Sequence, residues 1–140
     1  MNYVAYTDGA CRVSNPGLCS CAFVVYEDGV EKFRHGRFLG MGYTNNYAEY
    51  MGVIMLLEWA RDCGYEGLEI WCDSQLVVKQ VNAEWAVRPP LVDLCARAFK
   101  LLHETNSTLK HLRGHAGTLG NEVADEECNR ILDQEQHKTD

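Results

Sequence analysis

The stretch TNNYAEYMGVIMLL, residues 44–57, contains a carboxylate where an apolar side chain is expected. Its asparagines suit the start of a helix, and the apolar residues after them predict a helix over residues 46–63. At about 100° per residue, Glu49 lies on the face of this helix that carries Val53, Leu56, Leu57 and Ala60. Glu58 lies on the opposite face and can meet water. Glu49 must point toward the core, where an unpaired charge is costly.

The rest of the chain has the composition of an ordinary globular domain. Its 140 residues, 46% hydrophobic and 24% charged, are enough for one domain with a buried core. No apolar run approaches the length of a membrane span, and the N-terminus lacks the basic and apolar regions of a signal peptide. The seven cysteines include no C-x-x-C pair, which favours reduced, packed thiols over a disulfide framework. We therefore expect a cytoplasmic protein that does not bind membranes.

The net charge of −7 argues against general binding to nucleic acids. The charge is uneven, however. Residues 74–117 carry six basic groups against three acids, whereas residues 118–140 carry seven acids against two basic groups. A mildly basic middle beside an acidic end is compatible with a polyanion that is bound through metal ions.

Turn signals and periodicity predict the remaining elements. The predicted strands cover residues 2–7, 19–27, 30–39, 68–72 and 108–112, with Asp28-Gly29 as the turn of a hairpin. The further predicted helices cover residues 75–82, 91–104 after Arg88-Pro89-Pro90, and 121–134, and a frayed tail covers 136–140. This order predicts an α/β fold, a mixed sheet covered by helices. No repeat or linker divides the chain, so we expect one domain over residues 1–135.

Two of the predicted strands end at aspartates, Asp8 and Asp73. Ligand sites lie beyond the carboxyl ends of parallel strands, so these two side chains emerge together if their strands are neighbours. Glu49 would then approach from the helix packed above them. A fourth acid, Asp125, lies one turn into the last helix, with Asn121 on the same face.

Clustered carboxylates repel one another unless a cation offsets their charge or they take up protons. Mg²⁺ and Mn²⁺ prefer oxygen ligands, and two such ions about 4 Å apart can activate water and stabilise a leaving oxygen. Taken singly, each acid has an ordinary explanation as a turn former, a first-turn acid or a solvated helix residue. Together the four acids favour a metal site, and that site would explain why Glu49 points inward.

Four segments resemble, in order, the motifs of type 1 ribonuclease H: YTDGACRVSNPG (6–17), TNNYAE (44–49), WCDSQ (71–75) and LRGHAGTLGNEVAD (112–125). The resemblance covers nearly the whole chain. It implies a ribonuclease H-like fold with a five-stranded mixed sheet, three strands antiparallel and the others parallel. It also implies an endoribonuclease that cleaves the RNA strand of RNA–DNA hybrids with two Mg²⁺ or Mn²⁺ ions, leaving 5′-phosphate and 3′-hydroxyl ends.

The resemblance also assigns roles to individual residues. The matches to its catalytic, metal-binding carboxylates are Asp8, Glu49, Asp73 and Asp125, of which Asp8 would bridge both ions and Asp125 would help to hold the second. His115 matches a histidine on a mobile loop, where an imidazole can shuttle protons and assist product release. The substrate-binding candidates are Gly9, Ala10, Cys11, Asn15, Thr44, Asn45, Asn46, Gln75 and Arg113. Asn and Gln amides both donate and accept, which suits them to sense 2′-hydroxyl groups.

The chain departs from many members of that family after its third motif. The basic, Trp-containing protrusion is replaced by VNAEWAVRPP, residues 81–90, so the chain resembles the compact subgroup without it. With fewer phosphate contacts we predict weak hybrid affinity and a shallow salt dependence. Activity on other duplexes, binding without cleavage and a plain acidic domain remain alternatives, but the presence of all four acids favours cleavage. We expect a monomer that needs no protein partner.

Overall fold

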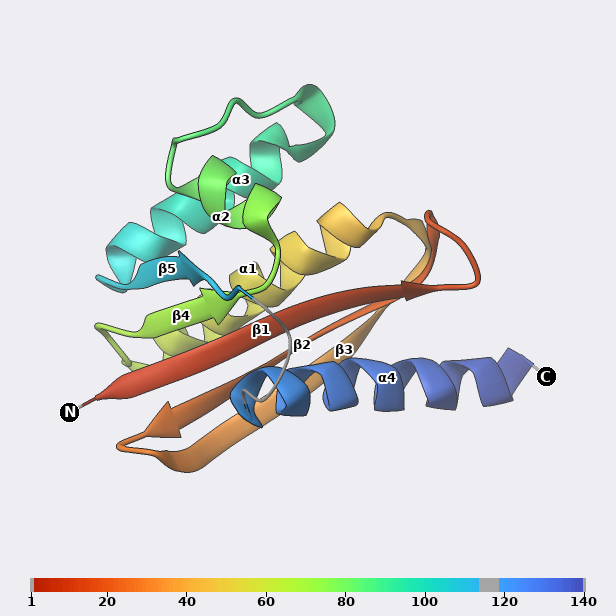
Figure 1. The fold of residues 1–140 in the computed structure, drawn as a ribbon, viewed down its shortest axis with the longest axis horizontal. Coiled ribbons are helices and arrows are strands. Elements are labelled where there is room, and N and C mark those ends of the chain that lie inside the picture. Colours follow the sequence, from red (N-terminus) through yellow and green to blue (C-terminus); the bar gives the residue numbers. More distant parts are fainter. Residues whose placement is uncertain (1, 114–118, 140) are drawn as a thin grey trace.

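The computed structural model describes residues 2–113 and 119–139. The chain follows the predicted order of elements (Figure 1): β1 (Tyr3–Arg12), β2 (Gly17–Glu27), β3 (Val30–Tyr43), α1 (Asn45–Cys63), β4 (Glu69–Cys72), α2 (Gln75–Val81), α3 (Pro89–Glu104), β5 (Thr108–His111) and α4 (Leu119–Thr139). Among these described segments, no helix is long and apolar enough to cross a membrane.

The five strands form one mixed sheet in the order β3-β2-β1-β4-β5, which confirms the predicted fold class. β1, β2 and β3 are antiparallel neighbours, whereas β1 pairs with β4, and β4 with β5, in parallel. In the parallel register Thr7 of β1 lies opposite Cys72 of β4. The residue after each of these, Asp8 and Asp73, therefore leaves the same end of two adjacent strands.

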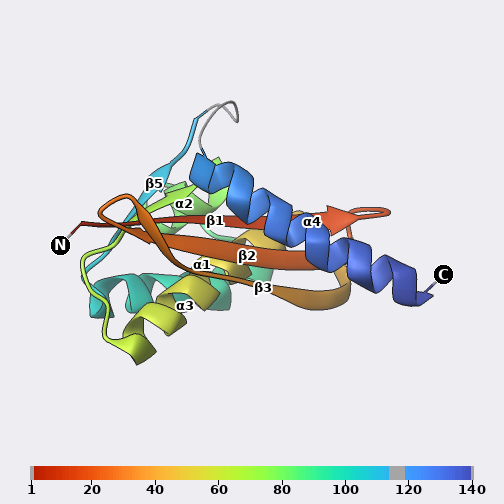
Figure 2. The same ribbon diagram turned by 90° about the horizontal axis from the view of Figure 1, so that it is seen from below.

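Helices cover both faces of the sheet. Figure 2 shows α4 along one face, with α1 and α3 on the other. The larger buried cluster lies on the α1 side, where apolar side chains of β1, β2 and β4 meet the inner face of the helix. Burial of this surface is the main favourable term in folding. This packing also fixes the distance of α1 from the sheet near the carboxyl ends of β1 and β4.

Local signals explain how α1 begins and ends. Thr44 caps the helix, because its hydroxyl accepts a hydrogen bond from the backbone N–H of Tyr47 at 3.1 Å. Asn45 is already inside the helix, so the cap lies one position earlier than the asparagines that the sequence favoured. Gly64 ends the helix at a φ of 79°, a conformation that glycine adopts without strain. Glu58 forms an ion pair with Arg97 of α3.

Several element boundaries differ from the prediction for identifiable reasons. β1 extends to Arg12 because its pairing with β2 continues past Asp8, and β3 extends to Tyr43 for the same reason. α3 begins at the prolines themselves, since a proline in the first turn lacks only an N–H that would be unpaired anyway. The hairpin turn is as predicted, with positive φ at both Asp28 and Gly29.

α4 is longer than predicted and continues to Thr139 through most of the segment that we expected to fray. Arg12, the last residue of β1, reaches across to the second half of this helix. Its guanidinium donates to the side chains of Asp133 and Gln136 and to both the carbonyl and the side chain of Asn129. These contacts hold the end of α4 against the sheet. Periodicity alone did not reveal them.

Candidate active site

The four predicted carboxylates converge at the carboxyl end of β1 and β4. Asp8, Glu49, Asp73 and Asp125 line one hollow of about 480 Å³. They come from four different elements or their ends, which are far apart in sequence. The same hollow is lined by three groups of residues that the sequence had singled out or that neighbour them: Gly9, Ala10 and Cys11 of β1, Asn45 and Asn46 of α1, and Ser74.

Two close backbone approaches set the distance between α1 and β1. A Cβ on Gly9 would lie 2.3 Å from the carbonyl carbon of Ala48, and a Cβ on Gly52 would lie 2.8 Å from the carbonyl oxygen of Asp8. Both contacts are with backbone, which cannot move aside as a flexible side chain can. Glycine at these positions therefore lets the helix come close enough for Glu49 to reach the aspartate of the strand.

The electrostatics of the cluster follow from burial and mutual repulsion. Burial raises the pKa of Asp8 to about 8, and the charges of Asp73 and Asp125 add to the rise. Burial likewise raises the pKa of Glu49 well above its ordinary value, with Asp73 and Asp8 contributing. One donor acts in the opposite direction: the backbone N–H of Gly9 lies 2.9 Å from Oδ1 of Asp8. The site disfavours several negative charges at once unless a cation is present.

The donor set fits a hard divalent cation. Oε1 of Glu49 is buried and has no hydrogen-bond partner among the described residues. Such a group costs free energy, which makes it an exception that calls for a ligand. Carboxylate oxygens are the ligands that Mg²⁺ and Mn²⁺ prefer, so the residues present are suited to hold these ions.

A second hollow, of about 270 Å³, continues the site toward α4. It is lined by Asp8, Asp73, Asn121, Glu122 and Asp125. Two residues that line these hollows were not predicted as site residues from the sequence: Glu122 in this second hollow and Ser74 in the first. Glu122 looked like one of several solvated acids on its helix. Ser74 looked like a cap alone, and it does accept from the backbone N–H of Val77. The spacing of Glu122 from Asp125, three residues on a helix, was the available signal.

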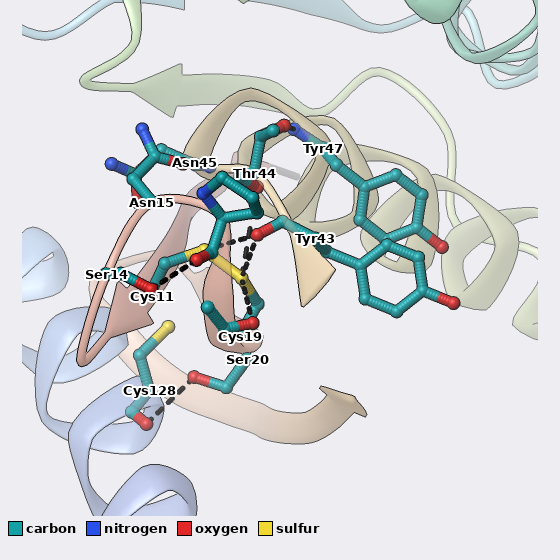
Figure 3. The surroundings of a disulfide bond; sticks show 12 residues. Cys11, Ser14, Asn15, Cys19, Ser20, Tyr43, Thr44, Asn45, Tyr47 and Cys128 are labelled. Atoms are coloured by element: carbon teal, nitrogen blue, oxygen red, sulfur yellow. Dashed lines mark hydrogen bonds between the residues drawn. A yellow bond between two sulfur atoms is a disulfide. The ribbon is translucent and has the colours of Figure 1, made fainter. Parts of the chain in front are cut away.

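The predicted substrate-binding residues are brought together only in part. Asn15 accepts a hydrogen bond from the backbone N–H of Asn45 at 3.0 Å, and Figure 3 shows their two amides pointing to the same side. Thr44 lines a neighbouring hollow of about 270 Å³ together with Asn46 and Arg88.

The remaining candidates lie at the edge of this arrangement or beyond it. Gln75 is exposed at the first residue of α2, two positions after Asp73. Arg113 is exposed and does not line the hollows named above. His115 falls outside the described residues.

A disulfide links Cys11 and Cys19, an exception to the reduced thiols that the sequence favoured (Figure 3). The two residues are direct cross-strand partners on β1 and β2, with Cα atoms 4.2 Å apart. The sequence missed this pair because the first strand was predicted to end at Thr7, which left Cys11 in a loop. The other five cysteines are free. The bridge lies beside the carbonyl of Tyr43, directly before the Thr44 cap.

Comparison with known proteins agrees with this fold. The RNase H family model matches residues 1–132. The ribonuclease H of Pseudomonas fluorescens is 35% identical, over 92% of this chain and 91% of the relative. The crystal structure of RNase H1 from the halophilic archaeon Halobacterium salinarum has a TM-score of 0.84 at 36% identity and covers 96% of this chain and 99% of that one.

A further solved structure, LC11-RNase H1 in complex with an RNA/DNA hybrid, has a TM-score of 0.84 at 27% identity and covers 96% of this chain and 99% of that one. The family model and the relatives that match over most of their length agree with the family resemblance of the sequence, and the solved structures agree with the fold. The chain therefore belongs to the ribonuclease H family, as a type 1 ribonuclease H, and is a hydrolase.

Proposed function

We propose that this protein is an endoribonuclease that hydrolyses the RNA strand of RNA–DNA hybrids by a two-metal-ion mechanism, giving 5′-phosphate and 3′-hydroxyl ends. The observation that carries the proposal is the convergence of four carboxylates on one hollow, with Oε1 of Glu49 buried and unpartnered among the described residues. The hybrid found in the complex of LC11-RNase H1 supports the substrate.

Each acid has a distinct position in the proposed site. Asp8 lines both hollows together with Asp73 and Asp125, and it is the candidate that would help to hold both ions. Glu49 and Asp73 would complete the coordination on the α1 side, and Asp125 would help to hold the second ion on the α4 side. When bound, two Mg²⁺ or Mn²⁺ ions would supply activation of the attacking water and neutralisation of the charge that develops on the leaving oxygen.

Polar groups around the carboxylates are suited to orient the hybrid. The side-chain amides of Asn15 and Asn45, which point to the same side, and those of Asn46 and Gln75 offer donors and acceptors to minor-groove edges and 2′-hydroxyls. Gly9, Ala10 and Cys11 line the same hollow, and their backbone groups are candidates to contact the hybrid. Thr44 uses its hydroxyl oxygen to accept from Tyr47, so its hydroxyl proton remains available to donate to a phosphate oxygen of the DNA strand.

His115 and Arg113 complete the proposal from the family motif. An imidazole that titrates near neutral pH can accept a proton at one ring nitrogen and release it to solvent, which suits it to proton transfer and product departure. The guanidinium of Arg113 is suited to contact a phosphate. Both assignments rest on the positions of these residues in the family motif.

The proposed enzyme is a cytoplasmic monomer without an obligatory protein partner. The five free cysteines support a reducing compartment, in which the Cys11–Cys19 pair would be the exception. Size-exclusion chromatography with light scattering tests the oligomeric state, and a mass near 15.9 kDa is expected.

Cleavage of end-labelled substrates tests the proposed activity. RNA–DNA hybrid, RNA duplex, DNA duplex and single-stranded RNA are incubated with Mg²⁺, Mn²⁺ or EDTA, and phosphatase sensitivity of the products reports the 5′-phosphate. We expect metal-dependent cutting of the RNA strand of the hybrid alone, with a loss of at least about 100-fold in Asp8→Asn.

The matched control is Asp93→Asn, which makes the same chemical change at an exposed position of α3. It should cut as the wild type does. Folded wild-type protein that cuts no hybrid with either metal would leave a binding domain as the better description. Cutting that persists in Asp8→Asn would show that the carboxylate cluster is not the site of the reaction.

A further inference from the structure

A thiol lies directly beneath the carboxylate cluster. Cys72, the last residue of β4, is fully buried and belongs to the cluster of core side chains under α1. Its Sγ and carboxylate oxygens of Glu49 and Asp73 all lie within 4.8 Å of one another. The donor set at this point therefore contains one soft sulfur and two hard carboxylates.

A second buried polar group points to the same place. Thr7 is fully buried, and its Oγ1 has no hydrogen-bond partner among the described residues. Thr7 and Cys72 are paired in register on adjacent parallel strands, so their side chains lie next to each other on one face of the sheet. Ala5, two residues earlier on β1, belongs to the core under α1, which identifies that face.

A ligand set of one sulfur and two carboxylates suits a thiophilic cation, whereas four carboxylates suit a hard cation such as Mg²⁺. Zn²⁺ and Cd²⁺ are thiophilic, and zinc in proteins is bound by Cys, His, Asp and Glu, commonly with four ligands. With Zn–S near ~2.3 Å and Zn–O near ~2.0 Å, ligands of one tetrahedral ion lie about 3.5 Å apart. Side-chain rotations of Glu49 and Cys72 can close the remaining gap. The oxygens Oε1 of Glu49 and Oγ1 of Thr7 are both buried without a hydrogen-bond partner among the described residues.

We propose that Glu49, Cys72 and Asp73 form a binding site for a thiophilic divalent cation of the Zn²⁺ or Cd²⁺ class, and that an ion bound there inhibits the nuclease. Binding forms a sulfur–metal bond and releases the thiol proton to solvent. Inhibition follows because the ion occupies two of the four carboxylates that the hard-metal site needs. This second half rests on the proposed function, whereas the binding itself does not.

Cadmium titration of the metal-free protein tests the site without reference to activity. Cd²⁺ bound to a thiolate gives an ultraviolet charge-transfer band, and binding to the native state raises the unfolding temperature. We expect both effects in the wild type at one ion per chain. The band should be lost, and the rise in unfolding temperature at a given Cd²⁺ concentration should be smaller, in Cys72→Ser and in Cys72→Ala, of which the second adds no polar group to the core. Circular dichroism shows which of the two variants is folded, and that variant is used for the titration.

The matched control is Cys63→Ser, which removes the exposed free thiol at the end of α1. This variant should bind Cd²⁺ as the wild type does. A band and a stabilisation that persist in the Cys72 variants and vanish in Cys63→Ser would overturn the proposal in favour of adventitious binding at the surface.

Inhibition is measured as the Zn²⁺ or Cd²⁺ concentration that halves hybrid cleavage in excess Mg²⁺, relative to the uninhibited rate of each variant. The Cys72 variants should require roughly 100-fold more inhibitor, since loss of even an outer-shell partner costs about 10- to 100-fold in metal affinity. Equal inhibition of wild type and variants would overturn the inhibitory role. A wild type that binds Cd²⁺ through Cys72 yet cuts no hybrid would support the site and refute the proposed function.

Discussion

Asp8 is a buried carboxyl whose ionisation opposes folding when no cation is present. Its pKa rises from an ordinary value near 3.8 to about 8 in the folded protein, chiefly through burial and then through Asp73 and Asp125. Between about pH 4 and pH 8 the unfolded chain loses this proton before the folded chain does. The contribution of Asp8 to the free energy of unfolding is therefore fully present below pH 4 and is lost as the pH rises through 8.

We expect Asp8→Asn to stabilise the metal-free protein at neutral pH, because the amide carries no charge to desolvate. The gain in the free energy of unfolding should be on the order of 2–4 kcal/mol at pH 7 and should disappear near pH 4. Urea unfolding in EDTA at several pH values measures it. The control, Asp93→Asn, should change stability by less than about 0.5 kcal/mol, as expected for an exposed site. A gain that did not depend on pH would rule out ionisation as its cause.

Excess Mg²⁺ should reduce or reverse this difference, because the ion stabilises the wild-type cluster and Asp8→Asn removes one of its ligands. The same urea titration in Mg²⁺ provides the comparison. Wild-type stability that is unaffected by Mg²⁺ at pH 8 would mean that the cluster does not hold the ion.

Single residues also show how far the sequence could predict the site. Glu49 could be identified because a carboxylate on an apolar helix face has few explanations, and Asp8 and Asp73 because each ends a strand. Cys72 could not be linked to them, since the proximity of its sulfur to Glu49 depends on how α1 packs over β4. The Cys11–Cys19 bridge depends on strand register beyond Thr7, which local sequence does not specify.

At the level of elements, the contact between α1 and β1 positions the carboxylates. Gly52→Ala would place a Cβ 2.8 Å from the carbonyl oxygen of Asp8, so the helix must shift outward. Overpacking costs about 1–3 kcal/mol, partly offset by about 0.5–1 kcal/mol from the better helix propensity of alanine. We expect a net loss of roughly 1–2 kcal/mol and, because Glu49 moves with the helix, a fall in cleavage rate of about 10- to 100-fold.

The matched control for this substitution is Gly36→Ala on β3. Its Cβ would lie 3.2 Å from Cγ1 of Ile131, whose side chain needs to give by only a few tenths of an ångström, and at ordinary contact distances from Glu127 and from the carbonyl oxygen of Cys21. Urea unfolding and cleavage assays should show the predicted losses of stability and rate in Gly52→Ala, and much smaller changes in Gly36→Ala. If Gly52→Ala cut hybrids at the wild-type rate, the close approach would have no part in positioning Glu49.

The second half of α4 depends on a contact made by a strand. We expect Arg12→Ala to lower the free energy of unfolding by about 1 kcal/mol, because a partly exposed ion pair contributes little but this guanidinium has several partners. Amide hydrogen exchange over residues 129–138 should quicken, while β2 remains protected. Lys138→Ala, which breaks only a local pair with Glu135, is the control. Unchanged protection in Arg12→Ala would show that the second half of α4 stays helical without the contacts of Arg12.

The sequence patterns were sufficient to predict the order of the helices and strands, but not where each of them begins and ends. Apolar periodicity and turn residues predicted each element. The lengths of β1, β3 and α4 depend instead on partners distant in sequence, such as the pairing of β1 with β2 and the reach of Arg12. α3 was predicted to start too late because two prolines were taken as a break, although a first helical turn accommodates them.

For the whole molecule, we expect net charge and the short link between α2 and α3 to determine how tightly a hybrid is bound. The chain carries a net charge of −7, and the link, residues 82–88, contains a single basic residue, Arg88. Each phosphate neutralised by a duplex-binding protein contributes about −0.9 to the slope of log K against log salt. With few cations near the site, we expect a slope between zero and about −3.

Fluorescence anisotropy with labelled hybrid and the inactive Asp8→Asn protein measures this slope. Adding Ala86→Lys, at an exposed position of the link, should steepen it by about 0.9 and tighten binding at low salt, because one more phosphate contact becomes available. Gln134→Lys makes the same change in net charge far along α4 and should leave the slope nearly unchanged. A wild-type slope as steep as about −6 would mean that the compact chain contacts the backbone widely despite its acidity. Equal effects of the two lysines would mean that net charge, and not the place of the link beside the site, governs hybrid binding.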